Sequence, residues 1–460
     1  PTPRTSVLDL RLSGALYFER LFLASMISLG KGDNEDIDVV LPSAPLEISS
    51  PFVSHTFKNR IPQILQRTLD YSKDKLKPQH VEGVEALIQE IKGDKPLQPI
   101  TDAKHDADEW NTALKGYVDR KATWSQAPWF LWETYMYRRL ASITHFWETG
   151  VDYFAAEKRK GLETTAAQIK ARAKVVQEIG GKWDYTTLRK LMLADLWGNQ
   201  ADASLFSATT MGDKGGQGGG SSSSDKLICD ESKRVFDVLE RHPVSKARKA
   251  VFFTDNAGLE IVSDLMLIDF LLTSKQVAVI ELKLKPYPYF VSDATPEDIK
   301  VTVDFLKQIG DKPCERLGTA IEKFIDSKKL ILTKEWFLTS SKPMWAMPKE
   351  LRSELRENTD LVFVKGDLMY RKLLGDYVLP PDLKFNDFLS YFPCPVVSLR
   401  TCKAPLIIGL AEGQAEELGK VSKDWCVSGM YGIIQVCDRE SRPVEVVATK
   451  SGFSVKYKNS

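Results

Sequence analysis

The sequence predicts an α/β protein: a doubly wound, mostly parallel sheet in a Rossmann-like three-layer arrangement, with an α-helical N-terminal domain. Residues 1–206 repeat apolar side chains at three- and four-residue spacing, which is typical of amphipathic helices. From about residue 245, short and nearly continuous apolar runs alternate with helical patterns, which is typical of parallel strands covered on both faces. We therefore expect a helical region at 1–206, a flexible Gly- and Ser-rich loop at 207–226 and an α/β domain at 227–460.

The helical spacing is clearest in four segments of the N-terminal region. They are Ile64–Leu69, Val81–Ile91, Trp129–Trp147 and Thr164–Ile179. The third is dense in aromatic residues, so we expect a buried helix there. For Arg138 and Arg139 within it, a position on the helix surface is expected rather than a place in a site.

Seven apolar runs in the second half are predicted to be buried strands. They are Ala250–Phe253, Val277–Leu282, Leu330–Leu332, Leu361–Val364, Val396–Leu399, Leu406–Ile408 and Ile433–Val436. Between the second and third runs, Thr295-Pro296-Glu297-Asp298 predicts a helix start, with Thr as the N-cap, Pro in the first turn and acidic residues beside them.

The charge balance argues against some classes of partner. With 63 basic and 62 acidic residues the formal net charge is +1, which gives no electrostatic case for nucleic acid or an anionic membrane. No apolar run approaches 18 residues, and no signal peptide opens the sequence. The six cysteines form no CxxC pair, so reduced thiols in a cytoplasmic protein are expected. The sequence does not indicate an oligomeric state.

Polar side chains follow four of the predicted strands. The segments are Thr254–Glu260, Lys285–Asp293, Lys365–Lys372 and Arg400–Lys403. Each alone fits a solvated loop. Because sites in open α/β sheets form beyond the carboxyl ends of the strands, the four together favour one shared site.

Three of these residues offer oxygen ligands. The carboxylates of Asp255 and Asp293 and the amide of Asn256 suit Mg²⁺ or Mn²⁺, with water completing the coordination. The five histidines include no pair at zinc-ligand spacing, so a zinc site is not expected.

Other residues at these strand ends suit an anion. Backbone N–H groups at Gly258, where a strand passes into a helix, can meet a phosphate. Glu260 either caps that helix or orients a water or a substrate hydroxyl. Lys403 and Arg371 could supply phosphate-binding charge, and Asp367 could hold a hydroxyl or act as a general base.

Four motifs in order resemble the damage-control phosphatase family. They are DNAGLE at 255–260, FVSDATPEDI at 290–299, KGDLMYRKLLGD at 365–376 and RTCK at 400–403. The last looks like the RTxK signature of the third subfamily, which includes sugar-phosphate phosphatases and proteins described as acidic-residue methyltransferases. The resemblance covers nearly the whole chain, and the joint occurrence of the four motifs makes it specific.

The resemblance implies roles by position. It implies metal ligation by Asp255, Asn256 and Asp293, with Mg²⁺, Mn²⁺, Co²⁺ or Ni²⁺ as the ion. It also implies catalytic roles for these three together with Glu260 and Asp367. The substrate-contacting positions it implies are Asp255, Asn256, Glu260, Asp367, Leu368, Met369, Tyr370, Arg371 and Lys403.

One position departs from the family pattern. Met369 stands where the family's motif has Asn, so an amide that can bind a sugar hydroxyl is replaced by an apolar thioether. Either the substrate is less polar than a sugar phosphate, or Met369 has become part of the packing.

The expected function is hydrolysis of a small phosphorylated metabolite, such as fructose 1-phosphate or a less polar phosphate ester. One alternative is S-adenosylmethionine-dependent methyl transfer to protein glutamate, although no Gly-rich first loop with an acid at the end of the next strand supports it. The other is a diverged metal-dependent lyase, isomerase or cyclase, for which Met369 is the sole indication.

Overall fold

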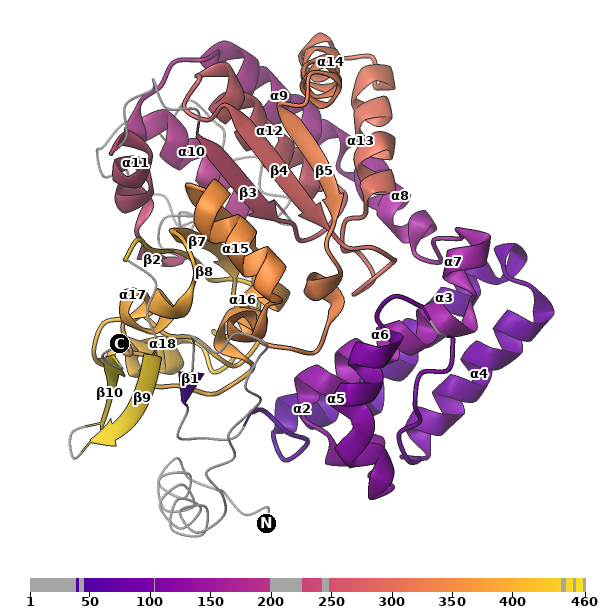
Figure 1. Cartoon of the computed structure of the whole chain (residues 1–460). Coiled ribbons are helices and arrows are strands. Elements are labelled where there is room, and N and C mark those ends of the chain that lie inside the picture. The colour runs from indigo at the N-terminus through magenta and orange to yellow at the C-terminus, as the bar shows by residue number, and fades with distance from the viewer. Residues whose placement is uncertain are drawn as a thin grey trace.

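Among the residues that the structure describes, seven strands form the central sheet, in the order β2-β8-β7-β6-β3-β4-β5 (Figure 1). Their bounds are β2 Leu227–Asp230, β3 Lys249–Phe253, β4 Val279–Leu284, β5 Leu330–Lys334, β6 Leu361–Lys365, β7 Val396–Thr401 and β8 Gly432–Cys437. All neighbouring pairs are parallel except β7 and β8. The α/β fold with a mostly parallel sheet is therefore confirmed.

The computed structural model describes residues 39–40, 45–102, 104–198, 226–241, 248–439, 444–449 and 452–457. Most of the expected loop at 207–226 lies outside these residues, as does His242. A small second sheet joins β1 Val39–Val40, β9 Val444–Thr449 and β10 Gly452–Tyr457. Within the described part of the chain, no helix combines the length and apolar character needed to span a membrane.

Side chains alternate between the two faces of the sheet, and each face has its own core. On β3, Ala250 and Phe252 point to one core while Val251 and Phe253 point to the other. The first face is covered by α9 Ala166–Ile179, α10 Tyr185–Leu196, α11 Ser232–Glu240, α12 Leu259–Thr273, α13 Pro296–Gln308 and α14 Lys312–Asp326. The second is covered by α15 Lys349–Asn358, α16 Gly366–Leu374 and α17 Phe385–Phe388, with α18 Gln414–Val421 at its margin. The result is a three-layer body.

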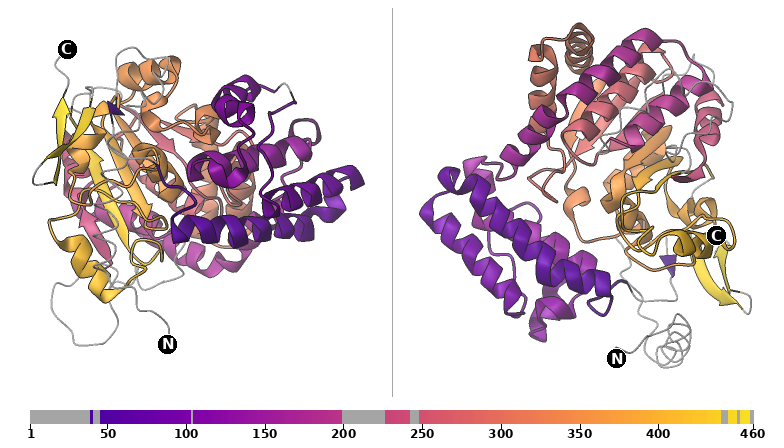
Figure 2. Two further views of the ribbon diagram at one scale, coloured as in Figure 1. Left: turned by 90° about the horizontal axis from the view of Figure 1, so that it is seen from below. Right: turned by 180° about the vertical axis from the view of Figure 1, so that it is seen from behind.

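The remaining helices form a lobe beside the sheet, which is visible in both views of Figure 2. They are α2 Pro51–His55, a π-helical turn Thr56–Arg60, α3 Ile61–Ser72, α4 Pro78–Lys92, α5 Ala107–Asp119, α6 Trp129–Ile143 and α7 Phe146–Thr149. Helix α8 Ala155–Thr164 leads from this lobe to α9 and α10, which lie on the sheet (Figure 1). Two helices of the range expected to be purely N-terminal therefore belong to the α/β body.

The order of the strands creates a switch point beside β3. The chain proceeds from β3 to β4 and β5 on one side, then returns to place β6 on the other side of β3. The connections thus leave β3 and β6 in opposite directions, which opens a crevice at the carboxyl ends of these two strands. Residues following β3 and β6 face each other there.

Two details of the predicted elements are wrong. Leu406–Ile408 is not a strand, because buried side chains rather than a neighbouring strand bind its backbone: Arg400 donates to the Leu406 carbonyl, and Gln435 to that of Ile408. The aromatic segment predicted as one helix breaks at His145, whose φ of 50° separates α6 from α7. The predicted helix start at Thr295 is confirmed as a capping box with Asp298.

Candidate active site at the sheet switch point

Asp255 lies at the switch point, directly after β3, and is 8% exposed. Its carboxylate rests against Gly366, the first residue of α16 after β6. A Cβ at position 366 would lie 1.9 Å from Asp255 Oδ2, and Gly366 has a φ of +80°. Both the close approach and the backbone conformation therefore require glycine here.

Asn256 connects Asp255 with Glu260. Its amide nitrogen donates to Asp255 Oδ2 at 3.2 Å and to both oxygens of Glu260 at 3.1 Å. Its amide oxygen accepts a 2.6 Å hydrogen bond from the Ser292 hydroxyl. The sequence-based alternatives for Glu260 were a helix cap and an orienting group, and in the structure its carboxylate holds the amide of Asn256.

The turn after β3 and the turn after β4 are bonded to each other through their backbones. Asn256 and Asp293 form an isolated antiparallel bridge. Ala257 N donates to the Ser292 carbonyl at 2.7 Å, and Ala294 N donates to the Asp255 carbonyl at 2.8 Å. The structure thus brings together Asp255, Asn256 and Asp293, as the sequence predicted for one edge of the sheet.

The backbone just before Ser292 is strained. Phe290 has a φ of 43° and Val291 a φ of 69°, and a left-handed conformation is rare for a β-branched residue. The helical lobe holds this turn: the Tyr137 ring stacks on Phe290 at 4.6 Å, and the Tyr153 hydroxyl donates to the Pro288 carbonyl at 3.0 Å. Such strain persists only where the surroundings enforce it, and it is concentrated at functional sites.

Asp293 is buried next to the ammonium group of Lys285. Lys285 Nζ lies 3.1 Å from Asp293 Oδ2, with which it forms an ion pair, and it also donates a hydrogen bond to the Thr254 carbonyl. Burial outweighs the attraction of Lys285 and raises the pKa of Asp293 to about 6. Burial and the neighbouring charges of Glu260 and Asp293 raise the pKa of Asp255.

These features fit a divalent cation. The raised carboxyl pKa values reflect buried negative charge that a cation would compensate. In the structure, the Asn256 amide nitrogen occupies a position between carboxylates, and binding a cation through its oxygen requires the amide to turn. Among the described residues, no three Asp, Glu, His or Cys side chains gather closely enough to form a metal cluster. The oxygen donors that these two turns offer are two carboxylates and one amide, a set that suits an ion keeping several waters.

Asp367 and Lys403 border the same crevice. Asp367 Oδ1 accepts from Arg400 Nε at 2.7 Å and from the backbone N of Lys403 at 2.9 Å. Arg400 is fully buried and also donates to the carbonyls of Ala404 and Leu406, so it shapes the turn that presents Lys403. The Lys403 side chain is exposed. Desolvation opposes its charge, but Glu260, Asp255 and Asp367 outweigh this and raise the pKa of Lys403.

A cavity of about 230 Å³ adjoins Asn256 and Ser292. Its other wall comes from the helices that lead out of the lobe, with Glu157, Lys158 and Thr165 among the lining residues. Neither these residues nor Lys285, Ser292 and Gly366 are predicted from the sequence to belong to the site. Lys285 and Ser292 stand in a segment that was singled out, so position alone could have included them, whereas nothing in the sequence pairs α8 with this edge.

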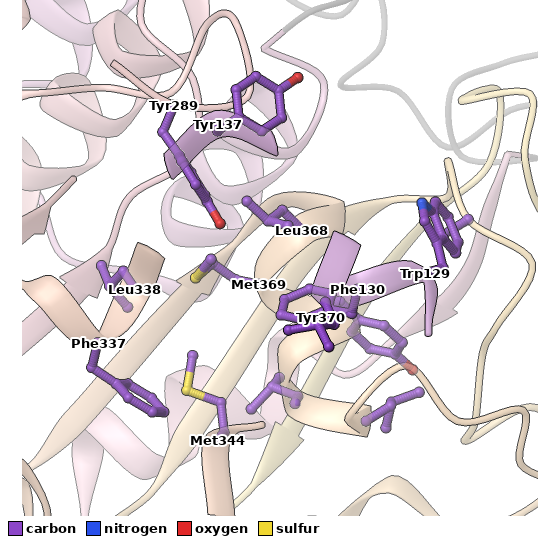
Figure 3. Packing of buried hydrophobic residues seen from close by; sticks show 14 of the residues in the cluster. Trp129, Phe130, Tyr137, Tyr289, Phe337, Leu338, Met344, Leu368, Met369 and Tyr370 are labelled. Carbon is purple, nitrogen blue, oxygen red and sulfur yellow. The ribbon is translucent and has the colours of Figure 1, made fainter. Parts of the chain in front are cut away.

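The side chains of Leu368, Met369, Tyr370 and Arg371, which are expected to contact substrate, are buried in this structure. Met369 is fully buried and lies in the core near Leu338 and Tyr289 (Figure 3). The Tyr370 hydroxyl donates to Gln435 at 3.1 Å. These residues lie in α16, a helix whose first residue, Gly366, is in contact with the Asp255 carboxylate.

Arg371 is paired inside the protein and does not offer charge to a phosphate. Its guanidinium binds Glu133 of α6 at 2.7 Å and Asp376 at 2.7 and 3.0 Å, and it lies 3.5 Å from the centre of the Trp129 ring. Arg138, expected on a helix surface, is likewise buried, bound to Asp102 and Asp106. Of the cations considered for phosphate binding, Lys403 alone lies at the crevice.

The chain is similar to known proteins over most of its length. A family model described as the damage-control phosphatase ARMT1-like domain matches residues 56–418. Similar curated proteins named damage-control phosphatase ARMT1 include that of Rattus norvegicus, 32% identical over 432 residues, with 84% of this chain and 95% of the relative covered. The Homo sapiens protein is 29% identical over 434 residues, covering 84% and 96%. The Danio rerio protein is 30% identical over 444 residues, covering 85% and 96%. A solved DUF89 family protein from Pyrococcus horikoshii matches with a TM-score of 0.43 and 16% identity, covering 85% of this chain and 98% of that one.

Proposed function

The chain belongs to the damage-control phosphatase ARMT1-like family, and we propose that it is a divalent-metal-dependent phosphatase that hydrolyses a small phosphate monoester. One observation carries the proposal. The turn with Asp255 and Asn256 is bridged to the turn with Asp293 at the switch point, where the Asp255 carboxylate lies against Gly366. Mg²⁺, Mn²⁺, Co²⁺ and Ni²⁺ are the candidate ions. Asp255, Asn256 and Asp293 would hold the ion through oxygen atoms.

A divalent ion bound there would supply a polarised phosphoryl oxygen and an acidified water molecule. The protein supplies the rest. Helices α12 and α16 both begin at the crevice, at Gly258 and Gly366, so their first N–H groups favour an anion. Lys403 adds a mobile positive charge at the mouth. Glu260 lies beside the Asn256 amide, and Asp367, held by Arg400, is the candidate for binding a substrate hydroxyl or accepting a proton.

The substrate we propose is a small polar metabolite, such as a sugar phosphate of the fructose 1-phosphate kind. The adjoining cavity of about 230 Å³ is smaller than typical drug-sized sites of roughly 300–1,000 Å³. Asn256, Ser292, Thr165, Glu157 and Lys158 line it, and these side chains suit hydroxyl groups. Because Met369 is buried in the core, it gives no reason to prefer a less polar ester or a lyase, isomerase or cyclase reaction.

Phosphate release from a panel of phosphorylated metabolites, with each of the four metals, tests this proposal. We expect metal-stimulated release that Asp255→Asn lowers at least about 100-fold, because one ligand carboxylate is lost. Asp304 on α13 is exposed, so Asp304→Asn is the matched control and should retain full activity. Full metal-stimulated turnover by Asp255→Asn would refute the assignment. Calorimetry with S-adenosylmethionine tests methyl transfer, for which no contact described above provides support.

A further inference from the structure

Lys285 is a buried cation that contacts both turns of the candidate site. It follows β4, and its side chain is 0% exposed. Its ammonium donates to the carbonyl of Thr254, the residue before Asp255, and lies 3.1 Å from Asp293 Oδ2. Its backbone N also donates to the Ala294 carbonyl at 3.1 Å. One side chain therefore connects the backbone next to one candidate ligand with the carboxylate of another.

The charges around it are unbalanced. Asp255, Glu260 and Asp293 carry three negative charges when ionised, and all three are at least nine-tenths buried. Lys285 lies beneath them as a fixed cation in contact with Asp293, whereas Lys403 is exposed at the mouth. Buried charges are costly unless paired. Lys285 therefore offsets part of this negative charge, and the remainder favours a divalent ion.

The contact also orients the carboxylate. Lys285 Nζ lies 3.1 Å from Asp293 Oδ2 and also donates a hydrogen bond to the Thr254 carbonyl. One carboxylate oxygen is thus held toward the interior, which leaves Oδ1 for a metal ion. Partners of metal-binding carboxylates commonly fix their orientation in this way.

On the basis of the proposed function, we propose that Lys285 is a positioning residue that holds Asp293 for metal binding through one oxygen and moderates the affinity of the site for the divalent ion. It contacts no substrate in this role. Its charge repels the incoming ion, while its contacts keep the two ligand turns in place. Removing it is therefore expected to affect metal binding and turnover in opposite directions.

Lys285→Met keeps an unbranched side chain, one atom shorter than lysine, and removes its charge. In the full chain we expect Mn²⁺ to bind about tenfold tighter by calorimetry, because a repelling charge is gone. Mn²⁺ should also raise the Tm of this variant more than that of the wild type. At saturating Mn²⁺, kcat for phosphate release should fall about tenfold or more with little change in KM, because Asp293 is no longer fixed.

Lys283→Met is the matched control. Lys283 lies on β4, two residues before Lys285, and is 2% exposed. It pairs with Glu281 and Glu354 at 3.1 and 3.0 Å, away from the candidate ligands. It should lower stability and leave Mn²⁺ affinity unchanged. Unchanged or weaker Mn²⁺ binding by Lys285→Met, or an unchanged kcat, would overturn the inference.

Two further measurements complete the test. If Lys285→Met does not fold, the double variant Lys285→Met/Asp293→Asn should, because it removes both charges of the pair. A double variant as unstable as the single one would show that Lys285 does not act through Asp293. A wild-type chain that binds no Mn²⁺ would refute the proposed function and this inference together, whereas normal binding by the wild type with an unaltered variant refutes the inference alone.

Discussion

A single hydrogen atom at position 366 makes room for the Asp255 carboxylate. Gly366→Ala would put a methyl carbon 1.9 Å from Asp255 Oδ2, at a φ of +80°. The carboxylate must move, and a displacement of about 1 Å in a catalytic group costs about 100-fold in rate. We therefore expect phosphate release to fall by at least that factor, and the free energy of unfolding to fall by about 1–3 kcal/mol from the strained backbone.

Gly116→Ala provides the comparison for that variant. Gly116 lies within α5, and an added Cβ there meets nothing within 4 Å. Alanine should stabilise the helix by roughly 0.5–1 kcal/mol and leave activity unchanged. Urea unfolding and phosphate release, measured on both variants, test the predicted changes in stability and activity. An active Gly366→Ala would mean that the position of the Asp255 carboxylate does not control turnover.

At the level of elements, helix α16 is attached to the lobe by a buried charge cluster. Arg371 binds Glu133 and Asp376 with no solvent nearby. Arg371→Met leaves two buried carboxylates without their cation, so we expect a loss of about 3–5 kcal/mol in the free energy of unfolding. The KM of the remaining folded enzyme should not change. A stable variant with a raised KM would instead restore Arg371 as a phosphate-binding residue.

The secondary-structure elements show which parts of the fold can be predicted from the sequence. Apolar runs predicted six of the seven strands of the central sheet within a few residues, because a strand buried on both faces needs such a run. They missed the short strand β2 and wrongly included Leu406–Ile408, since burial alone does not reveal what binds the backbone. The carboxyl-end rule predicts that Asp255, Asn256 and Asp293 lie at one edge of the sheet, and the structure joins the backbones of their two turns there.

The same rule could not tell which side chains of a motif face the site. Residues 367–371 begin a helix, and a helix turns successive side chains by about 100°, so Asp367 reaches the crevice while Met369 and Arg371 enter the core. Nor could sequence spacing pair Lys158 with Asp298, which lie 140 residues apart and join α8 to the start of α13. Such contacts are fixed by the tertiary fold.

At the scale of the whole molecule, the lobe and the α/β body share one hydrophobic core. The cluster on one face of the sheet runs from Val84 and Leu140 in the lobe to Val364 and Leu373 in the body. The lobe also holds the strained turn before Ser292, through Tyr137 and Tyr153. The site is therefore a product of both parts, and neither is expected to retain its structure when the other unfolds.

This shared core predicts a single unfolding transition. Five of the ten tryptophans lie between residues 110 and 147, so about half of the fluorescence signal comes from the lobe, whereas far-UV circular dichroism reports on all helices and strands. We expect both signals to change at the same urea concentration. Tyr137→Leu, which removes the ring contacts with Phe290 and Tyr289, should lower both midpoints equally. Two separate midpoints, or a shift in the fluorescence midpoint alone, would mean that the lobe folds independently and that the geometry around Asp293 does not depend on it.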